Sequence, residues 1–283
     1  MNCSLTFTAA LFSIILASCN GGSPGDWADL PEYTGEVVAV YGDSRTGHNA
    51  HDWLMEGMAS LAPAAVFHTG DLVEDGTIPE QWIIFNNIAS RLPSTTPMYP
   101  ALGNHEMESA LYFDNFDLPG NERWYSVDDI EKFKFIVLDT ESNLAEGSTQ
   151  FQWLEDEVIS SVSATDYTVV FFHYPLFSTG AHGSDEKGIA GDLVPLFEAY
   201  GVDAVFNGHD HDYERSTVND IRYIVTGGGG APLRDQSSTS DYSDLFVKAY
   251  HFCVLYFDDS GDLTVDVWDR KVKMIDRFVI ENR

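Results

Sequence analysis

Five short polar segments, each directly after an apolar, strand-like run, constrain this chain more than any other feature. They read Tyr41-Gly42-Asp43-Ser44-Arg45, Gly70-Asp71-Leu72-Val73, Gly103-Asn104-His105-Glu106, His173-Tyr174-Pro175 and Gly208-His209-Asp210-His211. In open α/β sheets, ligands bind beyond the carboxyl ends of the strands, which is where such segments fall. We therefore expect the fold to bring the five segments together at one site.

The segments supply candidate metal ligands of one chemical kind, oxygen and nitrogen donors without a thiolate. The candidates are two aspartates, one asparagine and three histidines: Asp43, Asp71, Asn104, His173, His209 and His211. Such donors suit Fe, Mn, Zn or Ni better than a structural zinc site built from cysteines. These ligands are too many for a single ion that must also hold water and substrate. They are about right for two ions that share one carboxylate.

The hydrophobic pattern predicts strands that alternate with helices through most of the chain. Strands are expected at 36–41, 64–68, 98–102, 133–139, 167–173 and 202–207, and helices at 51–61, 79–92, 150–162 and 193–200. This alternation is typical of a parallel or mixed sheet covered on both faces. After residue 215 the pattern predicts antiparallel strands at 221–226, 249–257, 263–268 and 274–280. The glycines at 227–230, followed by 233–244, predict a long mobile loop near the site.

The order and spelling of the segments resemble the calcineurin-like metallophosphoesterase superfamily, in its purple acid phosphatase-like branch. The most specific piece, at 208–215, reads Gly-His-Asp-His-Asp-Tyr-Glu-Arg and is similar to that branch's Gly-His-x-His-x-Tyr-Glu-Arg run. The resemblance extends from about residue 37 to residue 230, with a weaker continuation to the C-terminus. It implies an α/β fold that is a four-layer α/β/β/α sandwich of two mixed sheets.

The resemblance also implies a role for each ligand in a dinuclear centre of two divalent or mixed-valence ions (Fe, Mn, Zn or Ni). By this resemblance Asp71 bridges both ions, Asp43 and His211 complete the first, and Asn104, His173 and His209 complete the second. The implied reaction is hydrolysis of phosphomonoesters by metal-hydroxide attack. His105 is then the general acid for the leaving group or a group that orients the phosphate.

The sequence departs from the family around the first ion. Arg45 stands where many phosphodiesterase-type members have a histidine, and Glu74 stands where purple acid phosphatases have a tyrosine. His48, His51, Glu74 or water could supply the remaining ligand. Arg45 is better suited to contact a phosphate oxygen, since its guanidinium fork matches that group. His182 corresponds in approximate position to a further substrate-contacting histidine of the phosphatase branch.

The N-terminal residues are expected to direct export of the protein and to lie outside the folded domain. Residues 5–17 are apolar but too short to span a bilayer permanently, and Leu-Ala-Ser-Cys at 16–19 resembles a bacterial lipoprotein processing box. We expect a signal peptide at 1–19 with Cys19 as the acylation site, a linker at 20–35 and a metallophosphoesterase domain at 36–283. The protein would be exported to the cell envelope or periplasm, with membrane contact through the lipid anchor only. The sequence departs from signal peptides in having no Lys or Arg before the apolar stretch. A plain signal peptide cut nearby is the alternative, since the apolar stretch fits both kinds.

The net charge of the chain argues against one class of binding partner. Its formal net charge of −30 argues against nucleic acid, because phosphate backbones are bound by clustered Lys and Arg. The expected partner is a small-molecule phosphate ester, and the sequence does not indicate an oligomeric state. A phosphodiesterase on the same scaffold, acting on cyclic nucleotides or glycerophosphodiesters, remains an alternative. A non-catalytic cell-surface lipoprotein is an alternative of another class.

Overall fold

The structure is a computed structural model that describes residues 26–130, 132–162 and 166–280. The expected signal segment, Cys19 included, and residues 20–25 of the expected linker lie outside these described residues. Within them, no helix is both long enough and apolar enough to cross a bilayer.

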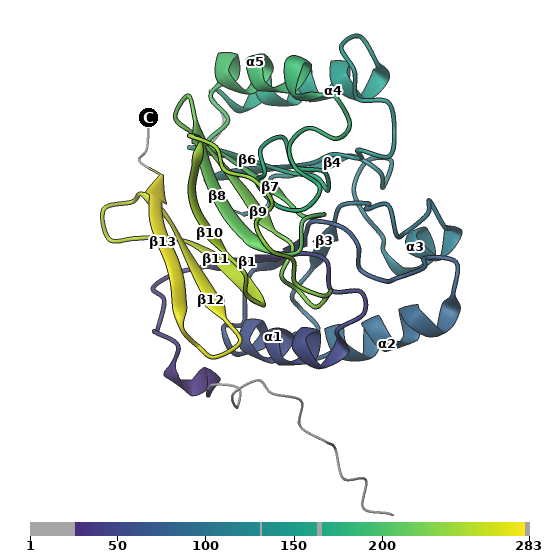
Figure 1. The fold of residues 1–283 in the computed structure, drawn as a ribbon, viewed down its shortest axis with the longest axis vertical. Helices are drawn as coiled ribbons and strands as arrows, with labels where there is room; N and C mark the ends of the chain where they lie inside the picture. The colour runs from purple at the N-terminus through teal and green to yellow at the C-terminus, as the bar shows by residue number, and fades with distance from the viewer. Residues whose placement is uncertain (1–25, 131, 163–165, 281–283) are drawn as a thin grey trace, which may run out of the picture.

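Two mixed sheets form the centre of the molecule (Figure 1). The first has the spatial order β13 (Met274–Ile280), β12 (Leu263–Asp269), β11 (His251–Phe257), β1 (Val37–Tyr41), β2 (Ala65–His68) and β3 (Met98–Pro100). The second has the order β10 (Ser243–Val247), β8 (Tyr213–Val218), β9 (Ile221–Thr226), β7 (Ala204–Asn207), β6 (Tyr167–Phe171), β5 (Phe133–Val137) and β4 (Tyr125–Val127). Parallel pairing joins β1 to β2 and β2 to β3 in the first sheet, and β5, β6, β7 and β9 in the second.

Helices cover the outer faces of both sheets and complete the four layers. They are α1 (His48–Ser60), α2 (Pro79–Ala89), α3 (Ala110–Asn115), α4 (Thr149–Ser161) and α5 (Ala190–Tyr200), with a short 3-10 turn η1 (Trp27–Asp29). Figure 1 shows α1 and α2 on one side of the molecule and α4 and α5 on the other. The predicted α/β/β/α sandwich is thus confirmed.

The burial of β1 explains why its sequence is almost continuously apolar. Val38 and Val40 point into the core between the two sheets, whereas Val37 and Ala39 point into the core beneath the helices. Successive side chains of a strand face opposite sides of the sheet, so a central strand in a sandwich is buried on both faces.

The chain after residue 208 differs from the predicted pattern. β11, β12 and β13 are antiparallel as expected, but β9 is antiparallel only to β8 and runs parallel to β7. β8 and β10 were not predicted, nor were α3 and β4 earlier in the chain. Their short or polar sequences gain order from pairing with a neighbouring strand or from packing, which a local pattern does not reveal.

The glycine run at 227–230 is packed against the first polar segment instead of forming a mobile loop. Gly229 N donates to the carbonyl oxygen of Gly42 at 2.8 Å. A Cβ on Gly229 would lie 2.3 Å from that oxygen, and one on Gly230 would lie 2.3 Å from the carbonyl oxygen of Ser44. The glycines therefore permit close approach of two backbones, and the expectation of mobility is wrong for this run.

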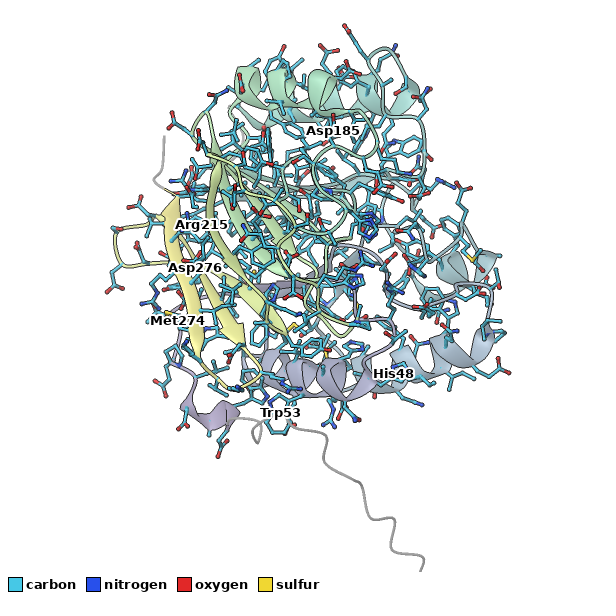
Figure 2. All side chains as sticks on the ribbon, in the orientation of Figure 1. His48, Trp53, Asp185, Arg215, Met274 and Asp276 are labelled. Atoms are coloured by element: carbon cyan, nitrogen blue, oxygen red, sulfur yellow. The ribbon has the colours of Figure 1, made fainter. Side chains whose placement is uncertain are left out.

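An ion pair ties the two sheets together next to the most specific motif. Arg215 on β8 donates from Nε to Asp276 Oδ2 on β13 at 2.7 Å, and Figure 2 shows the two labelled side chains side by side. Tyr213 donates from its hydroxyl to the same carboxylate oxygen at 2.7 Å. The Tyr and Arg of the motif thus anchor the segment that carries His209 and His211.

Candidate metal centre

Hydrogen bonds bring the polar segments of the two sheets together at their strand ends. Asp43 N donates to the carbonyl oxygen of Gly70 at 3.0 Å, which joins the segments after β1 and β2. Gly208 N donates to the carbonyl oxygen of His173 at 2.9 Å, which joins the segments after β6 and β7. His209 N donates to Asp43 Oδ2 at 3.0 Å and so links one sheet to the other.

Three of the predicted ligands adopt left-handed backbone conformations. The φ angles are 56° for Asp43, 59° for Asp71 and 69° for His209, and each residue directly follows a glycine. Such conformations cost about 1–3 kcal/mol for residues other than glycine, and they gather at functional sites. The left-handed turn after each strand therefore indicates that surrounding contacts stabilise a strained backbone, as at a functional site.

Asp43, Asp71 and His211 form the first ligand set. Each offers a ligand atom within 4.8 Å of the others, and His211 Nε2 lies 3.6 Å from Asp43 Oδ1. His211 donates from Nδ1 to the carbonyl oxygen of Pro232 at 2.9 Å, so Nε2 presents a lone pair. Asp43 Oδ1 is buried and has no hydrogen-bond partner among the described residues. A cation would satisfy both atoms.

His173, His209 and Asn104 form the second ligand set. His173 donates from Nδ1 to the carbonyl oxygen of Thr69 at 2.9 Å, which leaves a lone pair on Nε2. That nitrogen lies 3.1 Å from Asn104 Oδ1 and 3.3 Å from His209 Nδ1. His209 Nε2 lies 3.0 Å from Glu186 Oε2, so Nε2 carries the proton and Nδ1 is an acceptor. Acceptors that face one another repel unless a cation lies among them.

The histidines of both sets are in the protonation state that a metal requires. Burial lowers the pKa of His173, His209 and His211 to about 3, so their rings are neutral at physiological pH. Metal ligation by histidine needs the neutral ring.

Asp71 lies between the two sets. Its Oδ1 is 3.4 Å from His173 Nε2 and accepts a hydrogen bond from His105 N at 3.0 Å. Burial and then the nearby Asp71 carboxylate raise the pKa of Asp43 well above its usual range, and burial also raises that of Asp71. Two buried carboxylates at close range favour positive charge, so the donors fit two divalent ions that share Asp71.

Glu106 supports the centre and was not assigned a role from the sequence. It is fully buried, and its carboxylate accepts backbone hydrogen bonds from Gly103 at 2.7 Å, Asp71 at 2.9 Å and Leu72 at 2.7 Å. The fourth residue of the Gly-Asn-His-Glu segment thus fixes the loop that carries Asp71 to the loop that carries Asn104. The motif itself was the signal that could have pointed to this role.

His105, Arg45 and Glu74 lie beside the first set. His105 donates from Nδ1 to the carbonyl oxygen of Glu74 at 2.6 Å, which leaves Nε2 3.8 Å from Asp71 Oδ2. Arg45 pairs through Nη1 with the Glu74 carboxylate. Its Nη2 lies 3.2 Å from His211 Nε2, and its Nε lies 3.5 Å from Asp71 Oδ2. The guanidinium group of Arg45 therefore lies next to two of the acceptors, His211 Nε2 and Asp71 Oδ2.

Two of the histidines considered for the first ion do not reach it. His51 is buried in α1, where its Nε2 lies 3.1 Å from the hydroxyl of Tyr41 and its ring stacks on Phe85 at 5.5 Å. His48 is exposed at the start of α1 (Figure 2) and does not line the cavity over the centre. Glu74 lies beside the centre, where its carboxylate is paired with Arg45.

A small cavity of about 100 Å³ lies over the centre. It is lined by Arg45, Asp71, Asn104, His105, His182, His209, His211 and Arg234. His182 lies over His209 with the ring centres 4.1 Å apart, and its Nδ1 is 3.6 Å from Glu186 Oε2. No sequence pattern indicated Glu186 or Arg234, because both lie on loops without a periodic pattern.

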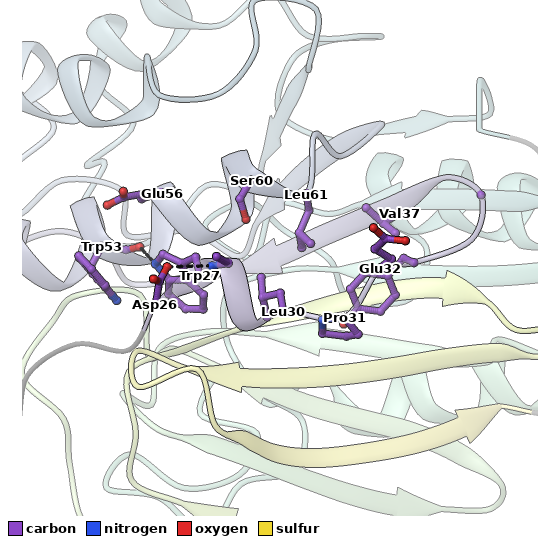
Figure 3. A pocket seen from close by; sticks show the side chains of 13 residues that line it. Asp26, Trp27, Leu30, Pro31, Glu32, Val37, Trp53, Glu56, Ser60 and Leu61 are labelled. Carbon is purple, nitrogen blue, oxygen red and sulfur yellow. Dashed lines mark hydrogen bonds between the residues drawn. The ribbon is translucent and has the colours of Figure 1, made fainter.

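A larger cavity of about 670 Å³ lies between the N-terminal turn and α1 (Figure 3). Trp27 closes part of it by donating from Nε1 to the carbonyl oxygen of Trp53 at 2.9 Å. It contains none of the predicted site residues. The chemistry therefore concentrates in the smaller cavity.

The family model described as calcineurin-like phosphoesterase matches residues 36–213. This match spans more than half of the chain and contains all six predicted ligands. The chain belongs to the calcineurin-like phosphoesterase family. The resemblance noted in the sequence is thereby confirmed.

Relatives of this chain lie among the purple acid phosphatases. One named "Probable inactive purple acid phosphatase 27", from Arabidopsis thaliana, is 29% identical over 75% of this chain and 43% of the relative. "Purple acid phosphatase 1" from Ipomoea batatas is 26% identical over 71% of this chain and 48% of the relative. This chain thus spans about half the length of these relatives. The solved structure of a purple acid phosphatase from yellow lupin seeds (22% identity) has a TM-score of 0.78 over 89% of this chain and 55% of that one, and so has the same fold.

Proposed function

We propose that this phosphoesterase hydrolyses small-molecule phosphomonoesters with the help of two divalent ions. Asp43, Asp71 and His211 would hold one ion, and Asp71, Asn104, His173 and His209 would hold the other. The observation that carries the proposal is the 3.3 Å approach of His173 Nε2 to His209 Nδ1, since both are acceptors held in that state by partners on the far side of each ring. The donors are neutral nitrogens and hard oxygens, which suit Fe, Mn, Zn or Ni.

Bound divalent ions would polarise the phosphoryl group and generate the nucleophile from water near neutral pH. His105 is the residue of this chain that handles the leaving group. Because the carbonyl oxygen of Glu74 accepts its Nδ1 proton, Nε2 is the nitrogen of His105 that remains for the leaving group, and it donates a proton when the ring is doubly protonated. The ring is partly exposed, with 25% of the side chain accessible, so it can exchange that proton with solvent.

The size and lining of the cavity favour monoesters over diesters. A space of about 100 Å³ suits a phosphoryl group whose ester arm extends outward, and a second arm would have to leave through the same lining. Arg45 and the histidines at 105 and 182 offer donors to the non-bridging oxygens. A phosphodiesterase reaction on the same centre is the alternative, with a diester bound partly outside the cavity.

A purely binding role is the alternative of another class, and the relative labelled as a probable inactive phosphatase gives it some support. A complete ligand set beside His105 favours catalysis, because a binding module has no need of a group that donates a proton. We expect the protein to hydrolyse chromogenic monoesters faster than diesters, to lose activity with chelator and to regain it with Mn or a similar ion. Full activity after exhaustive chelation, or no hydrolysis of either substrate by metal-loaded protein, would overturn the proposal.

A further inference from the structure

The cavity over the centre contains an arginine that forms no ion pair with a carboxylate in the described part of the chain. The chain carries 15 Lys and Arg against 45 Asp and Glu, so a basic side chain has many acidic partners available. Several arginines lie within 4.0 Å of a carboxylate oxygen: Arg45, Arg91, Arg123, Arg215 and Arg277. Arg234 lines the cavity, and it has no such ion pair within residues 26–130, 132–162 and 166–280.

The backbone around Arg234 is fixed to the ligand segments. Ala231 N donates to the carbonyl oxygen of Asp43 at 2.7 Å, and Arg234 N donates to the carbonyl oxygen of His211 at 3.1 Å. Between them, the carbonyl oxygen of Pro232 accepts the Nδ1 proton of His211 at 2.9 Å. With the preceding glycine run packed on the first polar segment, the loop fixes the backbone of Arg234 relative to two ligands of the first set, Asp43 and His211.

We propose that Arg234 binds the non-bridging oxygens of the substrate's terminal phosphoryl group and selects phosphomonoester dianions over diester monoanions. The proposal rests on the proposed phosphoesterase function for its substrate class. Arg234 shares the cavity with Arg45, His105 and His182, so cationic and neutral donors surround the space that a phosphoryl group would occupy.

The chemistry of phosphate favours an arginine at this position. A guanidinium group presents parallel N–H donors that match two phosphate oxygens. A monoester carries about −1.5 to −2 charges near neutral pH, whereas a diester has one ionisable oxygen fewer. Loss of the Arg234 charge should therefore weaken the binding of a monoester more than that of a diester.

The direct test measures binding of inorganic phosphate to the metal-loaded full chain by calorimetry. We expect Arg234→Gln to weaken phosphate binding by about 10-fold or more, since hydrogen bonds to charged groups contribute about 1.5–3 kcal/mol, with no loss of metal. Lys248→Gln is the matched control. It removes one positive charge from a residue that pairs with Asp235 at 2.9 Å and does not line the cavity. This control should bind phosphate within about twofold of wild type. Equal binding by wild type and Arg234→Gln, or an equal loss in the control, would overturn the inference.

A second measurement tests whether Arg234 selects monoesters over diesters or has only a structural role. Arg234→Gln should lower kcat/KM for a nitrophenyl monoester more than for the corresponding diester. Asp212 is buried with both carboxylate oxygens unpartnered among the described residues. A variant that only lowers the melting temperature, with phosphate affinity and selectivity unchanged, would mean that Arg234 offsets this buried charge, and the inference would fail. If metal-loaded wild type hydrolyses neither substrate but Arg234→Gln still weakens phosphate binding, the function proposed above fails and the oxyanion site stands.

Discussion

Glu186 and His209 form the hydrogen bond that decides which nitrogen of His209 faces the candidate metal centre. Glu186 Oε2 lies 3.0 Å from His209 Nε2, on the side of the ring away from His173. Carboxylates that hold the outer nitrogen of a histidine fix its tautomer and make it a better ligand. Glu186 lies four residues after His182 on the same loop, so the second ligand set and the cavity wall share one support.

Glu186→Gln should weaken retention of the second ion by about 10–100-fold, because an amide is a weaker acceptor and does not stabilise the ligated ring to the same extent. Metal content measured across a chelator titration tests this. Glu198→Gln is the control, since Glu198 accepts a hydrogen bond from Asn219 at 2.5 Å on the protein surface. Equal retention in both variants would contradict the role given to Glu186.

Asp71→Ala should cause the largest loss of metal of any single change, because both ligand sets depend on that carboxylate. Asn104→Ala touches only the second set, so it should keep one ion where wild type holds two. Elemental analysis of the purified, folded proteins distinguishes the two patterns. Two ions retained by Asp71→Ala would rule out a shared carboxylate.

His105→Ala should leave metal content near that of wild type and lower kcat by about 10²–10⁴ for substrates with poor leaving groups. Nitrophenolate departs without a proton, so a nitrophenyl substrate should lose less. A comparison of the two substrates on the same preparation provides the measurement. Equal losses would show that His105 orients the phosphate, and a fall in metal content would show that it supports the ligands.

Gly229→Ala should destabilise the fold by about 1–3 kcal/mol, because its Cβ would lie 2.3 Å from the carbonyl oxygen of Gly42. The displaced loop should also loosen the first ligand set. Gly191→Ala is the control, since a Cβ there meets no atom within 4 Å. Urea unfolding of the two variants measures the difference, and equal stability would contradict the close packing of the glycine run.

Acid should destabilise the fold through His51, which lies outside the metal centre. Burial lowers its pKa from 6.5 to about 3. Between these values the unfolded chain binds a proton that the folded chain does not, so stability falls as the pH falls. The free energy of unfolding should therefore depend less on pH in His51→Phe, by about 1.4 kcal/mol per pH unit over this range. Urea unfolding with chelator at pH 7, 6 and 5 tests the slope, and parallel profiles for variant and wild type would contradict the expectation.

The sequence by itself determined the layered fold and the six candidate ligands. Apolar runs such as that of β1 are buried on both faces, and a polar segment after such a run falls at the carboxyl edge of a sheet. That is a local pattern with a general physical cause. The Gly-Asp and Gly-His pairs at Asp43, Asp71 and His209 marked the turns where the backbone becomes left-handed.

Only the tertiary structure decided which of several similar residues take part. His51 and His173 are both buried neutral histidines, but the first is hydrogen-bonded to a tyrosine hydroxyl in the core while the second faces Asn104. Glu186 and Arg234 reach the site from irregular loops whose course depends on contacts far away in the sequence. Long-range packing fixes the direction of each side chain, and no local pattern of residues encodes that direction.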